Sequence, residues 1–229
     1  MKSFLVSRRL SVRLVRLYAG LFLYGLAIAM LLRSGLGASP WDVLSQGVAR
    51  VSGLSFGTTT VVVSVVVLLF WIPIRQRPGW GTLSNTLLIG VFADLGLAWT
   101  PAAHDLAWQA TALGGGLALL AVASALYIGA GLGPGPRDGL MTGLVARTGQ
   151  AVWVVRSAIE LTVVLVGWLL GGTVGIGTAV FAFGIGPLIQ VAMRVLRVEL
   201  AVDTGSAPAL SRPAAGVSEQ AGISVVGER

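Results

Sequence analysis

The sequence predicts an all-α polytopic membrane protein. We expect six transmembrane helices as two inverted three-helix repeats, each with a re-entrant or interfacial half-helix. The first observation is composition: of 229 residues, 55% are apolar and only 11% are charged. A soluble domain has about a quarter of its residues charged. The apolar residues also fall in runs of about twenty, the length with which a helix crosses about 30 Å of hydrocarbon.

The second observation is an internal repeat. The segment 35–44 returns as the segment 131–140, an offset of 96 residues, and six of the ten residues are identical. The same offset continues without a gap to Gly90 and its counterpart Gly186. The chain is therefore two copies of one unit. In very apolar chains, such duplicated units often enclose a membrane pathway between two halves.

Composition also excludes several classes of protein. There are no cysteines, so disulfides, thiolate metal sites and cysteine nucleophiles are excluded. No catalytic set of side chains stands out, and we expect neither an enzyme nor a cofactor. The net charge of +7 comes from arginines beside apolar runs. This placement indicates orientation in a lipid bilayer and not binding to nucleic acid.

The first predicted span, 14–32, follows a basic segment, 1–13, and imitates a secretory signal peptide. The counterpart of its apolar stretch 17–32, at 113–128, lies mid-chain, where no signal peptide acts, so we expect a retained first helix. The other predicted spans are 56–74, 81–99, 107–130, 152–171 and 177–196. They divide the chain into repeat 1 (14–99), repeat 2 (107–197) and a cytoplasmic tail (203–229) whose composition predicts disorder.

Between the first and second span of each repeat lies a segment that is too short to cross the membrane. These segments, 40–52 and 136–148, would be about 20 Å long as helices. Each begins with helix-start signals, namely Ser39 before Pro40 in the first copy and Pro136 in the second. Each is followed by a glycine, as helix ends commonly are. We therefore expect two half-helices.

The arginines indicate how the spans are oriented. With six spans and a cytoplasmic N-terminus, only Arg33 and Arg50 fall on the outer side, and the outer loops 100–106 and 171–177 carry no Lys or Arg. The positive-inside rule thus predicts that both termini are cytoplasmic. A repeat with three crossings enters the membrane in the opposite direction the second time. The repeats should be inverted about an axis in the membrane plane.

The phrase GLGASPWDVL at 35–44, with GWGT at 79–82 and IGVFAD at 89–94, resembles the YczE/YitT-type family of bacterial multipass membrane proteins. The resemblance covers about 14–197. In the second copy Arg137 replaces Trp41 and Gly135 replaces Ser39. The resemblance implies a location in the bacterial plasma membrane, and it brings no established substrate or activity.

Two acids recur in both copies, Asp42 and Asp138. An acid in the first turn of a helix can accept backbone N–H groups and suits the positive end of the helix dipole. The alternative is a cation or proton site at the mouth of a half-helix. The two roles compete, because a carboxylate tied to its own helix has less to offer a cation.

Four glycines precede the half-helices: Gly35, Gly37, Gly131 and Gly133. They are expected to let the backbone leave a transmembrane helix and turn sharply. The alternative is simple close packing of helices.

Asp94 lies inside the third span, and its counterpart in the sixth is Gln190. An ionisable group at membrane depth is costly, so it lines a cavity or is paired. Since Asp94 is close to the end of its span, it could instead reach the interface.

Arg156 and Glu160 lie four residues apart on one face of the fifth span and can pair. Their counterparts in the first copy are the hydroxyl residues Thr60 and Ser64. The pair is either structural or a gating or substrate contact.

Two functions remain open at this point. The first is a transporter-like protein with a pathway for a small solute or ion between inverted repeats. The second is a membrane scaffold or regulatory accessory protein that acts as a homo-oligomer or with a membrane partner, as the scarcity of intramembrane charge allows.

Overall fold

The computed structural model describes residues 2–196, with side chains from residue 10 onward, and this range is helical without strands. The predicted tail, 203–229, lies outside the described residues. Six helical segments are long and apolar enough to cross a membrane. The helices are α1 (Lys2–Ser34), α2 (Pro40–Ser52), α3 (Phe56–Leu69), α4 (Trp71–Ile74), α5 (Trp80–Trp99), α6 (Leu106–Gly129), α7 (Pro136–Thr148), α8 (Val152–Leu169) and α9 (Ile176–Val195).

The two short helices begin and end at the predicted residues. The Ser39 hydroxyl accepts the Asp42 N–H at 3.3 Å and so caps the start of α2. Proline occupies the first position of both α2 and α7, where no backbone donor is needed. Gly53 and Gly149 end these helices in the left-handed conformation, with φ of 73° and 66°.

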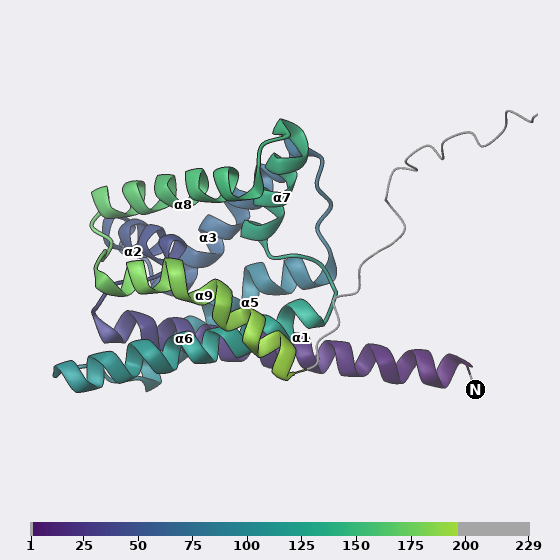
Figure 1. Ribbon diagram of the computed structural model, residues 1–229, viewed down its shortest axis with the longest axis horizontal. Coiled ribbons are helices and arrows are strands. Elements are labelled where there is room, and N and C mark those ends of the chain that lie inside the picture. The colour runs from purple at the N-terminus through teal and green to yellow at the C-terminus, as the bar shows by residue number, and fades with distance from the viewer. Residues whose placement is uncertain (1, 197–229) are drawn as a thin grey trace, which may run out of the picture.

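Two helices depart from the predicted spans, and a third contains a proline. Helix α1 continues through the basic segment 2–13, well beyond its apolar part. The second span is interrupted at Phe70 and resumes as the short α4, which contains Pro73. Helix α9 contains Pro187, whose ring cannot donate to the preceding turn. The helix bends near its middle in Figure 1.

Helices α1 and α6 lie side by side along the length of the molecule and hold most of the core (Figure 1). Small residues let the two backbones approach closely. A Cβ on Gly20 would lie 2.8 Å from the Tyr127 nitrogen, and a Cβ on Gly116 would lie 3.0 Å from the Leu31 side chain. Helix α5 packs against α1 and α9 packs against α6, whereas α2 packs against α3 and α8.

A pair of reciprocal hydrogen bonds links the two halves of the chain. The Gly81 N–H, in repeat 1, donates to the Leu132 carbonyl in repeat 2 at 2.7 Å. The Gly177 N–H, in repeat 2, donates to the Leu36 carbonyl in repeat 1 at the same distance. Gly177 is the counterpart of Gly81, and Leu132 is the counterpart of Leu36, each 96 positions later, so the second bond repeats the first with the halves exchanged. Each repeat thereby holds the glycine turn of the other.

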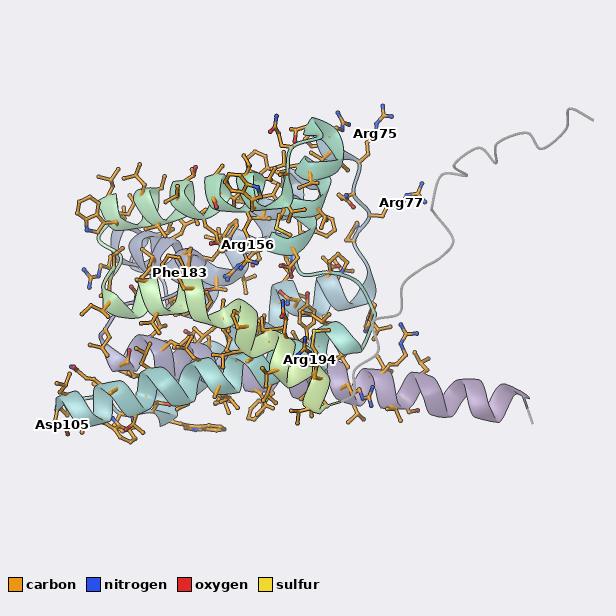
Figure 2. All side chains as sticks on the ribbon, viewed as in Figure 1. Arg75, Arg77, Asp105, Arg156, Phe183 and Arg194 are labelled. Atoms are coloured by element: carbon orange, nitrogen blue, oxygen red, sulfur yellow. The ribbon has the colours of Figure 1, made fainter. Side chains whose placement is uncertain are left out.

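The charged residues labelled in Figure 2 are unevenly distributed along the molecule. Arg75 and Arg77 lie in the half toward which the N-terminal end of α1 projects, and Arg194 lies in the same half. Asp105, which caps the start of α6, lies at the opposite end.

Candidate functional site

Two glycine turns, one before each half-helix, bring the starts of α2 and α7 into the interior of the bundle. All four glycines have positive φ, which other residues rarely adopt. The values in the two copies are nearly equal: 69° at Gly35 and 61° at Gly131, then 120° at Gly37 and 122° at Gly133. The turn conformation is therefore the same in both copies.

The starts of α2 and α7 meet through the counterparts Trp41 and Arg137. The Arg137 guanidinium lies over the Trp41 ring, 5.2 Å from its centre, as cations do on aromatic faces. It also lies 3.7 Å from the Asp42 carboxylate. Asp42 is only 2% exposed and accepts a hydrogen bond from the Ser39 hydroxyl. Trp41 and Arg137, the counterparts that differ between the two copies, thus join the two half-helices.

A cavity of about 250 Å³ opens beside this junction. Its charged lining comes from the start of α7 and from α8: Arg137, Asp138, Arg156 and Glu160. The hydroxyls of Ser39 and Ser124 also line it. Aromatic and aliphatic side chains from α1, α6 and α9 complete the wall, among them Tyr24, Tyr127, Phe181 and Ile185. Asp138 is exposed, and its carboxylate lies beside the Tyr127 hydroxyl near Gly135.

A second, smaller cavity of about 60 Å³ lies against the same junction. It shares Tyr24, Tyr127, Arg137 and Asp138 with the first. The rest of its lining includes the counterparts of residues in the large cavity: Thr60 for Arg156, Ser64 for Glu160, Asn85 for Phe181 and Ile89 for Ile185. The two cavities therefore occupy equivalent places in the two repeats. The cavity of repeat 1 is small and has uncharged residues at these four positions, whereas the cavity of repeat 2 is larger and has Arg156 and Glu160.

Tight packing in repeat 1 explains the difference in size. Gly57 of α3 and Gly90 of α5 touch backbone to backbone, and a Cβ on either would overlap the other's carbonyl oxygen. In repeat 2, Trp153 replaces Gly57 and is 72% exposed. A Cβ on Gly186, the counterpart of Gly90, would meet nothing within 4 Å. Helices α8 and α9 therefore stay apart where α3 and α5 close.

Asp94 secures the closed pair in repeat 1. Its carboxylate accepts the Gly57 N–H at 2.7 Å and the Ser55 hydroxyl at 2.5 Å. It thus caps the start of α3 from a different helix, at the end where backbone N–H groups have no partner within the helix.

Arg156 and Glu160 pair on α8, with 2.9 Å between Nε and Oε1. The arginine side chain is 49% exposed and that of the glutamate 27%. In Figure 2, Arg156 points from α8 into the space between α8 and α9. The pair predicted from the i, i+4 spacing is present and lines the large cavity.

The structure gathers part of the predicted set at one place. Ser39, Pro40, Asp138, Arg156 and Glu160 line the large cavity, and Pro136 lines the small one. Asp42 is buried behind Arg137. Asp94, which belongs to α5, contacts the start of α3. The exposed Gln190 lies outside the linings of both cavities. Among the described residues, no group of three or more His, Cys, Asp or Glu could hold a metal ion.

Several lining residues were missed by sequence reasoning. Tyr24, Tyr127 and Phe181 carry no local signal that separates them from other aromatic residues of transmembrane helices. Trp41 and Arg137 did carry one, because their exchange between otherwise similar motifs marks a place where the two copies meet.

Residues 11–194 match the model of a family of unknown function, DUF6198. The chain belongs to this family. The matched residues run from the first apolar helix to the last and include both half-helices. No solved structure matches the chain.

Curated relatives support the same assignment. An uncharacterized protein of Haemophilus influenzae is 39% identical over 77% of this chain and 81% of its own length. The uncharacterized membrane protein YczE of Bacillus subtilis is 31% identical over 76% of this chain and 81% of its own length. The uncharacterized protein YyaS of the same organism is 26% identical over 77% of this chain and 90% of its own length. The resemblance to YczE-type membrane proteins is confirmed.

Proposed function

We propose that this DUF6198 member is a transporter-like protein of the bacterial plasma membrane, with a pathway for a small solute between two inverted repeats. The observation that carries the proposal is the charged cavity at the junction of the half-helices. Charged groups inside a membrane are costly, and where they line a cavity they mark substrate or ion pathways. Half-helices that start near such a cavity are a common feature of transporters.

The reciprocal contacts support a two-fold relation between the repeats. A two-fold axis turns a contact between residue i and residue j of the other half into a contact between j and i. The two hydrogen bonds to Leu132 and Leu36 have this form, as do the contacts of Gly20 and Gly116 between α1 and α6. With three crossings in each repeat, the axis lies in the membrane plane.

Orientation follows from the same arrangement. We propose that both termini are cytoplasmic, because the positive-inside rule places Arg75, Arg77 and Arg194 on that side. The end of the molecule that carries Asp105 is then extracytoplasmic.

The unequal repeats suggest how the pathway opens. Helices α3 and α5 are closed by Gly57, Gly90 and Asp94, whereas α8 and α9 are separated beside the cavity. Movement of one repeat against the other around a fixed central site is the general mechanism of transporters built from repeats. The proposal assigns the cavity to binding and passage and not to catalysis.

The test is solute flux into liposomes that contain the purified protein in a verified orientation. We expect the protein to move at least one solute from a panel of ions, amines, carboxylates and neutral compounds. Ile159→Trp, which fills the cavity from α8, should abolish this flux. Leu161→Trp is the matched control, since Leu161 is two residues away and 70% exposed.

Two outcomes would contradict the proposal. Equal flux through both variants would place the pathway elsewhere. No flux of any solute through the correctly oriented protein would leave the accessory or scaffold role.

A further inference from the structure

The large cavity contains an acid, Asp138, that forms no ion pair with a basic side chain in the described part of the chain. Arg137 lies 3.7 Å from Asp42, and Arg156 lies 2.9 Å from Glu160. Each arginine thus has its own carboxylate. Asp138 has no Lys, Arg or His nitrogen of the described residues within ion-pair distance, and Arg137 and Arg156 act on its carboxylate only from farther away. Asp138 is also exposed to the cavity.

The charges of the whole junction also leave one acid in excess. Two arginines face three acids, because Asp42 and Asp138 both belong to the half-helix starts and Glu160 belongs to α8. A surplus carboxylate inside a membrane is unfavourable until a positive charge reaches it. From this surplus we propose that the cavity binds a small organic ammonium compound through the Asp138 carboxylate. The inference rests on the proposed transport function and names the class of its substrate.

The walls of the cavity suit the organic part of such a ligand. Aromatic rings of Tyr24, Tyr127 and Phe181 surround it, and isoleucines of α8 and α9 cover the remaining side. Cations bind to the faces of aromatic rings, most strongly where water is excluded. The Arg137 guanidinium over Trp41 is an instance of this contact in the same wall.

An inorganic cation or an anion suits the cavity less well. A bare metal ion needs several oxygen ligands around it, whereas most of this wall is aromatic or aliphatic. An anion would find both arginines already paired and would face Asp138 at close range. The volume of about 250 Å³ limits the ligand to a small molecule.

Asp138 also connects the two cavities. It lines both, together with Tyr24, Tyr127 and Arg137. An ammonium group bound to this carboxylate therefore lies where the large cavity of repeat 2 meets the small one of repeat 1. The hydroxyl and amide groups of Thr60, Ser64 and Asn85 on the far side are acceptors for its N–H groups.

The test is isothermal titration calorimetry on the full chain in detergent, with butylammonium, butanol and butyrate as probes. We expect butylammonium to bind about tenfold or more tightly than butanol, the effect of one charge-assisted hydrogen bond, and butyrate not to bind. Asp138→Asn should remove this preference. Asp105→Asn, the same chemical change at the exposed cap of α6, should keep it.

The selectivity series on the unchanged protein keeps the test decisive if Asp138→Asn fails to fold. Butyrate bound as tightly as butylammonium would overturn the inference, as would heat from sodium chloride alone. Flux of a solute without binding of butylammonium would overturn only the substrate class. Butylammonium binding without flux of any solute would overturn only the transport function.

Discussion

At the scale of residues, four aspartates of this chain have different contacts and therefore different roles. Asp94 and Asp105 each satisfy backbone N–H groups at the start of a helix. Asp42 is buried and faces Arg137. Its carboxylate accepts the Ser39 hydroxyl, and its own backbone N–H donates to the oxygen of that hydroxyl. Asp138 alone of these faces the cavity linings. Burial and partners, more than residue type, separate these roles.

The role of Asp94 leads to a stability prediction. Asp94→Ala leaves the Gly57 N–H and the Ser55 hydroxyl without their acceptor, so we expect a loss of about 1–3 kcal/mol in the free energy of unfolding. Asp94→Asn keeps an amide oxygen for the Gly57 N–H and should lose about 1 kcal/mol or less, the value of a charge at a helix start. Thermal unfolding in detergent measures both. Equal midpoints for the two variants would show that the cap is not what Asp94 provides.

Only part of the site could be predicted from the residues themselves. The glycine turns, the capping Ser39 and the Arg156–Glu160 pair depend on neighbours within four positions, and local spacing is sufficient to predict them. Asp94 is different, because its partners Ser55 and Gly57 lie on another helix. Local spacing in a sequence carries no information on which helices touch.

At the scale of elements, the packing of α3 on α5 and the separation of α8 from α9 can be tested at counterpart positions. Gly90→Ala should cost about 1–3 kcal/mol or more, because the new Cβ overlaps the Gly57 carbonyl oxygen. Gly186→Ala is the matched control, since its Cβ would meet nothing within 4 Å. The unfolding midpoint in detergent is the measurement. If Gly186→Ala were as destabilising as Gly90→Ala, α8 and α9 would be closed in solution.

The elements were more predictable than the spaces between them. Both half-helices have the predicted bounds because a proline and a glycine fix their ends. The interruption at Phe70 was missed, although Pro73 was visible as a residue that weakens a helix. The large cavity could not be predicted. Repeat 2 lacks the close contact that Gly57 and Gly90 make in repeat 1, since Trp153 stands in place of Gly57 and a Cβ on Gly186 would meet nothing within 4 Å. Only the packed structure shows this difference.

At the scale of the whole molecule, the two halves are joined by contacts that a two-fold axis would produce. The Gly81 N–H donates to Leu132 and the Gly177 N–H donates to Leu36. Likewise, Gly20 of α1 packs against Tyr127 of α6, and its counterpart Gly116 of α6 packs against Leu31 of α1. Such contacts arise from an axis in any direction. Transport by alternating exposure needs the axis in the membrane plane, so that equivalent parts of the repeats face opposite sides.

The direction of the axis can be tested with a pair of counterpart residues. Ser52 and Thr148 are the exposed last residues of α2 and α7, and the chain has no native cysteine. If the repeats are inverted, a membrane-impermeant maleimide should label Ser52→Cys on intact cells, because the positive-inside rule places the end of α2 outside. Thr148→Cys should react only after the membrane is permeabilised. Labelling of both variants from the same side would show that the repeats are parallel, and would remove the basis for a pathway between inverted halves.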